Sequence, residues 1–351
     1  MPDNELKSAG VGGQVITLLK LALVAGCIAI VVNRLNFYEL LRVWQGLVPG
    51  FLLLAAFFIM TEPLVVAFKW HLLIRGSGVP ASFGEVLRAI LTGNFLSILF
   101  PTSLSADALR LALLGRRHRD LAHLTGTLVA DRLAAVAGLV VLSLAGLPFA
   151  LRSLGWSRAL MGVVLLCVFT SAAIAVILAP WTQRLLVWLD GWAQQHPSAG
   201  RTIKFMRRAT GIVRRVYNPL MQLIRQPRLL LIVFSMGIGV QLWRIMQIRM
   251  LFLSLGATHA FIYDVAFVPM IILLTLLPIS FFGLGIKEGA FIFFFTSIGL
   301  AVEKCVGVSL LTYPLIILAL LPGGVLFLLG DRTQLMKSVE QSETQDVLQR
   351  E

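Results

Sequence analysis

Long apolar stretches constrain this chain more than any other feature of its sequence. A helix that crosses a bilayer needs about 20 predominantly apolar residues. Seven stretches approach or exceed that length: 15–32, 50–74, 122–147, 159–179, 229–252, 261–280 and 305–329. Only 13% of the 351 residues are charged, whereas a soluble domain carries about 25%. The sequence therefore predicts an all-α, polytopic membrane helical bundle and excludes soluble and disulfide-scaffold folds.

Two further apolar stretches, 86–100 and 289–300, are shorter than a full crossing requires. We expect each to be a re-entrant or broken helix, so that the bundle has about 7–9 helical segments. The sequence alone leaves open whether 86–106 and 282–300 re-enter or cross. It also leaves open the side of the N-terminus.

The basic residues predict an orientation in the membrane. The chain has a formal charge of +13, and its arginines and lysines gather in segments 110–120 and 181–228. Cytoplasmic loops carry such an excess, so both segments are predicted to be cytoplasmic and the protein to lie in the plasma (inner) membrane. Segment 253–260 has no Asp, Glu, Lys or Arg and is expected on the opposite side. A basic excess of this origin implies no nucleic-acid partner.

The same basic region divides the chain into parts. We expect an N-terminal membrane half (1–180), a basic linker (181–228), a C-terminal membrane half (229–330) and a disordered polar tail (331–351). Within the linker, residues 201–217 interleave apolar and basic side chains. This pattern predicts an interfacial helix on anionic inner-leaflet lipids, although a solvated linker fits it as well.

The first of two polar motifs interrupts the N-terminal half at residues 93–110. Pro101 ends an apolar segment, a Thr-Ser-Leu-Ser break follows, and a new helix opens with Asp107 and Arg110. These two residues are three apart, so they share a helix face and are expected to pair. The polar residues of interest here are Asn94, Ser103, Asp107 and Arg110.

The second motif repeats this order in the C-terminal half. Pro278 ends an apolar span, Ser280 follows, and a helix opens with Lys287 and Glu288 after two glycines. Corresponding interruptions in two halves of a membrane protein indicate a transport site built from broken helices and a possible inverted repeat. Helix N-termini at such breaks favour phosphate. We predict that both breaks meet near mid-membrane, although interfacial turns at helix ends would also explain them.

Further ionisable residues lie within predicted spans, where each is costly. Asp131 and Arg132 are neighbours, so they point about 100° apart and should find different partners. Arg244 lies in a polar stripe with Gln241 and Gln247, and its guanidinium suits phosphate. Glu62, before Pro63, is a candidate for proton or ion coupling. Helix–helix contacts or snorkelling would explain the same residues.

The two motifs resemble those of the flippase-like transmembrane domain of lysylphosphatidylglycerol synthases, over roughly residues 15–330. The first motif matches at Gly93, Asn94, Pro101, Asp107 and Arg110. The second motif matches at Pro278, Ser280, Gly283, Gly285, Lys287 and Glu288. Asp131 and Arg132 resemble the acid–arginine pair that follows the first motif in the family. The chain departs from the family pattern at Ser105-Ala106, at Phe281-Phe282 and at Lys287. The resemblance implies lipid translocation without the aminoacyl transfer of the synthases.

We therefore predict a transporter, not an enzyme, that moves an anionic phospholipid or a polyprenyl-phosphate-linked lipid between leaflets. The predicted headgroup residues are Asn94, Ser103, Asp107, Arg110, Asp131, Arg132, Arg244, Ser280, Lys287 and Glu288. No cofactor or metal is expected. The alternatives are an accessory subunit of a lipid or glycan biosynthetic complex and an intramembrane glycosyl- or phospho-transferase. The expected protein partner is either a second copy of the chain, in a homodimer, or a biosynthetic complex. The transferase lacks support because the chain has no DxD motif.

Overall fold

The computed structural model describes residues 44–97, 105–118, 120–156, 158–178, 216–276 and 285–348, with a few isolated positions besides. From residue 329 onward it describes the backbone alone. The described residues are mostly helical and contain no strand. The expected span 15–32, most of the segment 201–217, and the breaks that hold Ser103 and Ser280 lie outside the described residues.

Four described helices are long and apolar enough to cross a membrane. They are α3 (Pro49–Gly76), α6 (Leu121–Leu154), α10 (Pro227–Ser254) and the part Val302–Leu328 of α13. A proline stands at the start of α3 and of α10, where its missing N–H costs no hydrogen bond. The predictions of an all-helical fold and of these four spans are confirmed. Two shorter predicted spans correspond to α7 (Arg158–Leu178) and α11 (Phe261–Thr275).

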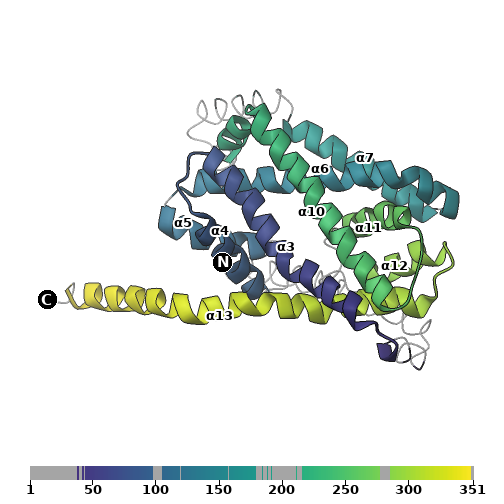
Figure 1. The fold of residues 1–351 in the computed structure, drawn as a ribbon. Helices are drawn as coiled ribbons and strands as arrows, with labels where there is room; N and C mark the ends of the chain where they lie inside the picture. Colours follow the sequence, from purple (N-terminus) through teal and green to yellow (C-terminus); the bar gives the residue numbers. More distant parts are fainter. Residues whose placement is uncertain are drawn as a thin grey trace, which may run out of the picture.

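Helices α3 and α10 run side by side and antiparallel (Figure 1). At one end the backbone N–H of Val48 donates to the carbonyl of Ser254 at 2.8 Å. At the other end the side-chain amide of Gln226 donates to the carbonyl of Gly76 at 3.2 Å. These contacts define two ends of the bundle, which we call the 76/226 end and the 48/254 end.

The N-terminal end of α6 lies at the 76/226 end. A Cβ on Gly126 would lie 3.3 Å from the carbonyl oxygen of Val216 and 3.0 Å from Pro219. The basic segment before α6 and the end of the basic linker therefore share one end of the bundle. This arrangement is what the predicted cytoplasmic placement of both segments requires.

Helices α4 (Phe83–Ser97) and α5 (Ser105–His118) form a hairpin that opens toward the 76/226 end. Glu85, at the start of α4, contacts Arg117 at 2.9 Å and His118 at 3.0 Å, both at the end of α5. The described part of α4 has 15 residues and is therefore about 22 Å long, shorter than a hydrocarbon core of about 30 Å. The hairpin enters and leaves at one end, as a re-entrant element does.

The carboxyl group of Glu85 is tuned by this contact. Burial raises its pKa, but hydrogen bonds from the Ser82 N–H and from His118, together with the charge of Arg117, lower the pKa by more. The net pKa lies below the usual carboxyl value. The ionised form therefore stabilises the joined ends of α4 and α5.

Helices α11 and α12 (Ile286–Thr296) form a second hairpin that opens toward the 48/254 end. The centre of the Phe295 ring, near the end of α12, lies 4.4 Å from the centre of the Phe252 ring and 5.4 Å from that of the His259 ring. The ammonium of Lys304 then donates to the carbonyl of Gly256 at 2.9 Å, which places the start of α13 at the same end. The two hairpins thus open toward opposite ends, the relation that an inverted repeat produces.

Helix α13 (Val302–Leu348) runs along the bundle and extends past it (Figure 1). It packs closely on α4, because a Cβ on Gly323 would lie 2.1 Å from the carbonyl oxygen of Leu91. The expectation of a disordered tail at 331–351 is wrong as far as Leu348, where the backbone stays helical. After Gly330 the segment has neither glycine nor proline and is rich in residues that favour helices.

Candidate functional site

A cavity of about 230 Å³ lies among the helices α3, α4, α5, α6, α10 and α13. Its polar lining consists of Glu62, Lys69, Asn94, Arg110, Asp131, Arg132, Gln241 and Arg244. Its apolar lining consists of Ile59, Pro63, Val66, Ile90, Ala135, Val240, Ile316, Ala319 and Leu320. Most of the ionisable residues that the sequence singled out in the N-terminal half therefore face one space.

The cavity lies near the middle of the spanning helices. Glu62 is 13 residues from the start of α3 at Pro49 and 14 from its end at Gly76. Gln241 has the same 14 and 13 residues to the ends of α10. At 1.5 Å per residue, both are about 20 Å from either end. Ionisable side chains at that depth are costly and indicate a functional site.

Arg110 binds Asp107, the partner that the sequence predicted, and one further residue. Its Nη1 donates to Oδ1 of Asp107 at 3.0 Å, so the predicted three-residue pairing is confirmed. Its Nη2 donates to Oδ1 of Asn94 on α4. A Cβ on Gly93 would lie 2.8 Å from Cγ of Arg110 and 3.1 Å from the carbonyl oxygen of Ala106. Only a residue without a side chain at 93 lets the Arg110 side chain pass over α4.

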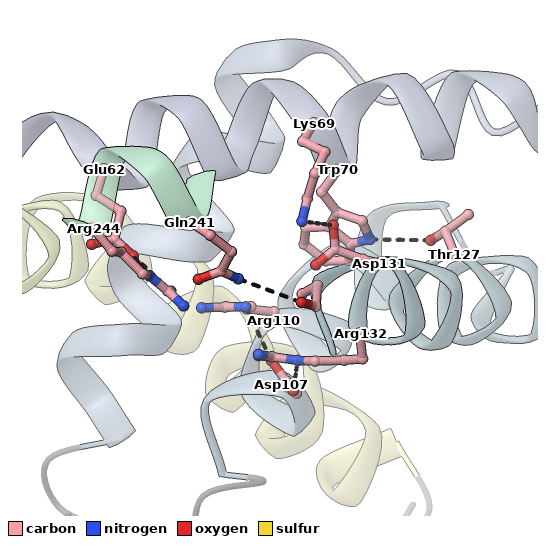
Figure 2. Close-up of polar contacts among 11 residues, drawn as sticks. Glu62, Lys69, Trp70, Asp107, Arg110, Thr127, Asp131, Arg132, Gln241 and Arg244 are labelled. Atoms are coloured by element: carbon pink, nitrogen blue, oxygen red, sulfur yellow. Dashed lines mark hydrogen bonds and ion pairs between the residues drawn. The ribbon is translucent and has the colours of Figure 1, made fainter. Parts of the chain in front are cut away.

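Asp107 also binds a second arginine. Nε of Arg132 donates to Oδ2 of Asp107 at 2.8 Å, and Nη2 donates to Oδ1. This bidentate pair joins α5 to α6 (Figure 2). Asp107 is buried, whereas 49% of the Arg132 side chain is exposed. Part of the Arg132 side chain therefore stays accessible.

Asp131 has a different partner from Arg132, as their neighbouring positions predicted. Its Oδ1 lies 3.0 Å from Nζ of Lys69 on α3, and both side chains are buried. Beside this pair, Nε1 of Trp70 donates to Oγ1 of Thr127 at 3.2 Å. The two contacts join α3 to α6 through buried polar groups.

Glu62 and Arg244 join α3 to α10. Nη2 of Arg244 lies 2.7 Å from Oε1 of Glu62, and the amide of Gln247 donates to Oε2 at 2.8 Å. Trp243 and Gln247 both donate to the carbonyl of Phe58, at 2.8 and 3.2 Å. These contacts bind α10 to the part of α3 just before Pro63, whose missing N–H interrupts the hydrogen bonds of that helix.

The ionisable groups of this site carry a net positive charge. Four cations (Lys69, Arg110, Arg132 and Arg244) meet three carboxylates (Glu62, Asp107 and Asp131), which leaves one positive charge in excess. Figure 2 shows the guanidinium groups of Arg110 and Arg244 extending toward each other from opposite sides of the site. An arrangement of this kind can bind an anion with several oxygen acceptors, such as a phosphate group.

The second motif lies beside this cavity without lining it, as far as the described residues extend. Glu288 is buried in the first turn of α12, where it accepts hydrogen bonds from the N–H of Gly285 at 2.6 Å and from Ser309 at 2.8 Å. Tyr313 donates to it at 3.0 Å, and Nζ of Lys287 lies 4.7 Å from the centre of the Tyr313 ring. Because Ser103 and Ser280 lie outside the described residues, the meeting of the two breaks stays a prediction.

Helix α13 connects this second cluster with the cavity. Tyr313 contacts Lys287 and Glu288, and Ile316 and Leu320 line the cavity. Residues three and seven positions apart share one face of a helix. The same face of α13 therefore contacts both clusters.

Sequence reasoning missed some of the cavity residues. Lys69 was not among the predicted headgroup residues, although it lies seven residues after Glu62 and so on the same face of α3. Gln241 was noted in the polar stripe but not as a site residue. The apolar contribution of α13 had no signal in the sequence, because Ile316 and Leu320 look like any lipid-facing residues of a span.

Comparison with known proteins identifies the class of this membrane bundle. Residues 17–323 match the family described as the lysylphosphatidylglycerol synthase TM region. The chain belongs to this family, as the motifs predicted. No curated protein and no solved structure matches it.

Proposed function

We propose that this protein moves an anionic lipid between the two leaflets, and that the cavity binds the phosphate of its headgroup. The lipid is a phospholipid or a polyprenyl-phosphate-linked lipid, and it undergoes no chemical change. The observation that carries this proposal is the group of four cations around a cavity at mid-membrane depth. A purely structural subunit has no need for an excess positive charge at that depth, where its burial is costly.

The partners of these cations support a site that can exchange one anion for another. Arg132 and Arg244 are bound by carboxylates, yet 49% and 33% of their side chains are exposed. A phosphate can therefore take hydrogen bonds from donors that the carboxylates do not use. In the empty site the carboxylates limit the cost of the buried positive charge.

The apolar half of the lining favours a lipid over free phosphate. Ile316 lines the cavity and is 40% exposed, and the exposed Ile317 and Leu318 follow it in α13. An acyl or prenyl chain can extend along this face while its phosphate stays inside. We propose that the lipid passes this edge when its headgroup enters the cavity.

Glu62 is the group that we propose couples movement to protons. Its carboxylate holds Arg244, so an arriving phosphate competes with it for the same guanidinium. Glu62→Gln is therefore expected to remove any dependence of transport on a pH gradient.

The proposal is tested with purified protein in vesicles that contain a fluorescent anionic phospholipid. The fraction of probe accessible to a quencher outside the vesicles reports movement between leaflets. Arg244→Gln and Arg132→Gln are each expected to slow movement about tenfold or more, because a hydrogen bond to a charged group contributes about 1.5–3 kcal/mol. A short polyprenyl phosphate is then added as a competitor. If it slows movement of the fluorescent phospholipid, the cavity accepts polyprenyl-phosphate-linked lipids; if it does not, the lipid is a phospholipid.

Arg152→Gln is the matched control. Arg152 is an exposed arginine in the last turn of α6 and does not line the cavity. It should move lipid at the wild-type rate. Equal rates for all three variants, or a wild-type rate no higher than that of protein-free vesicles, would refute the proposal.

A further inference from the structure

A buried amide in the wall of the cavity has a free acceptor. Gln241 is 1% exposed and lines the cavity between the ion-paired residues. Its Nε2 donates to the carbonyl oxygen of Ala135 on α6 at 3.4 Å. Its Oε1 has no hydrogen-bond partner among the described residues.

The orientation of this amide is determined by its surroundings. The carbonyl of Ala135 can only accept a hydrogen bond, so the amide nitrogen, not the oxygen, must face it. Figure 2 shows the nitrogen of Gln241 turned toward α6 and the oxygen turned toward the side where Arg244 lies. A buried acceptor without a partner is unfavourable, and a ligand that supplies a donor removes this cost.

Nearby polar atoms do not serve this acceptor. Two of the three Arg110 nitrogens bind Asp107 and Asn94, and Nε of Arg110 is buried without a partner. Glu62 takes the contact from Arg244. The wall thus offers a free donor and a free acceptor among charged groups that are already paired.

We infer that Gln241 is a specificity-determining residue, and that it accepts a hydrogen bond from the group esterified to the headgroup phosphate. The preferred lipid therefore carries a hydroxyl or ammonium donor next to its phosphate. The cations bind the phosphate itself, and Gln241 distinguishes headgroups of equal charge. This inference rests on the proposed function of the cavity.

The experiment measures binding of short-chain lipids to the full-length protein in detergent, in two matched pairs. Phosphatidylglycerol and phosphatidylmethanol carry the same charge, but only the first has headgroup hydroxyls. Phosphatidylethanolamine and phosphatidylcholine form the second pair, in which only the first has N–H donors. We expect the donor-bearing lipid to bind about fivefold more tightly in at least one pair, the gain typical of one hydrogen bond. The pair that shows the preference identifies the donor as a hydroxyl or an ammonium.

Gln241→Met keeps the length of the side chain and removes the acceptor. It should abolish the preference for the donor-bearing lipid, so that the two lipids of the pair bind equally.

The outcomes separate this inference from the function on which it rests. If the wild-type protein binds the two lipids equally in both pairs, Oε1 of Gln241 binds only water and the inference is wrong. The proposal of an anionic lipid site is unaffected by that result. If no anionic lipid binds better than neutral diacylglycerol, both the site and the inference fail. The wild-type comparison gives this answer even where a variant fails to fold.

Discussion

Removal of one partner from the Lys69–Asp131 pair should destabilise the protein strongly. The pair joins α3 to α6 at 3.0 Å, and the exposed fractions of the two side chains are 2% and 8%. Asp131→Asn leaves a buried ammonium without its counter-charge, and Lys69→Met leaves a buried carboxylate. Loss of one member of such a pair costs about 3–5 kcal/mol. The neighbouring hydrogen bond from Trp70 to Thr127 cannot compensate, because neither group is charged.

The double variant Lys69→Met/Asp131→Asn should recover most of this loss. It buries no unpaired charge, and replacement of a whole buried ion pair is often close to neutral. The free energy of unfolding is measured in mixed micelles by circular dichroism for the wild type, the two single variants and the double variant. These four values form a double-mutant cycle. We expect a coupling of about 2 kcal/mol or more between the two sites.

A single variant elsewhere controls for loss of charge alone. Arg152→Gln removes an exposed charge at the end of α6 and should change the free energy of unfolding by less than about 0.5 kcal/mol. Additive costs of the two single variants, or a cost below about 1 kcal/mol for Asp131→Asn, would refute the argument from burial.

Three further predictions concern packing, pH and access to the cavity. Gly323→Ala should destabilise the protein by about 1–3 kcal/mol, because its Cβ would overlap a backbone carbonyl of α4, whereas Gly239→Ala, with nothing within 4 Å, should not. Acidification below the usual carboxyl pKa should lower the melting temperature, because Glu85 has a lowered pKa and its stabilising charge is lost as pH falls through that value; Glu85→Gln should flatten this dependence. Ile316→Trp should slow lipid movement in vesicles, whereas Ile317→Trp, exposed and outside the cavity lining, should not.

Local spacing predicted the parts of the site that depend on a single helix. Asp107 and Arg110 are three residues apart, which is enough to bring their side chains together. The divergence of Asp131 and Arg132 also follows from helix geometry alone, and the structure gives them the separate partners Lys69 and Asp107. The long spans were equally predictable, because apolar length is a property of each stretch by itself.

The contacts between helices could not be predicted in this way. Glu62 and Arg244 are 182 residues apart, and nothing in either stretch specifies the other. The hairpin of α4 and α5 raises the same difficulty, since a short apolar stretch does not reveal whether the chain returns to the end at which it entered. Contacts of Glu85 with Arg117 and His118 answer that question in the folded chain.

The ion pairs of the cavity also connect the elements that would move in the transport that we propose. Asp107 joins the first hairpin to α6, Asp131 joins α6 to α3, and Glu62 joins α3 to α10. A phosphate that binds the arginines competes with Asp107 and Glu62, so its arrival weakens the links from α6 to the hairpin and from α3 to α10. The Lys69–Asp131 pair is the most buried of the three and is the link best placed to persist. Headgroup binding would then loosen the hairpin and α10 relative to α3 and α6, which stay joined. A ligand drives a change of conformation only if its contacts differ between the two states, and this competition for the arginines supplies such a difference.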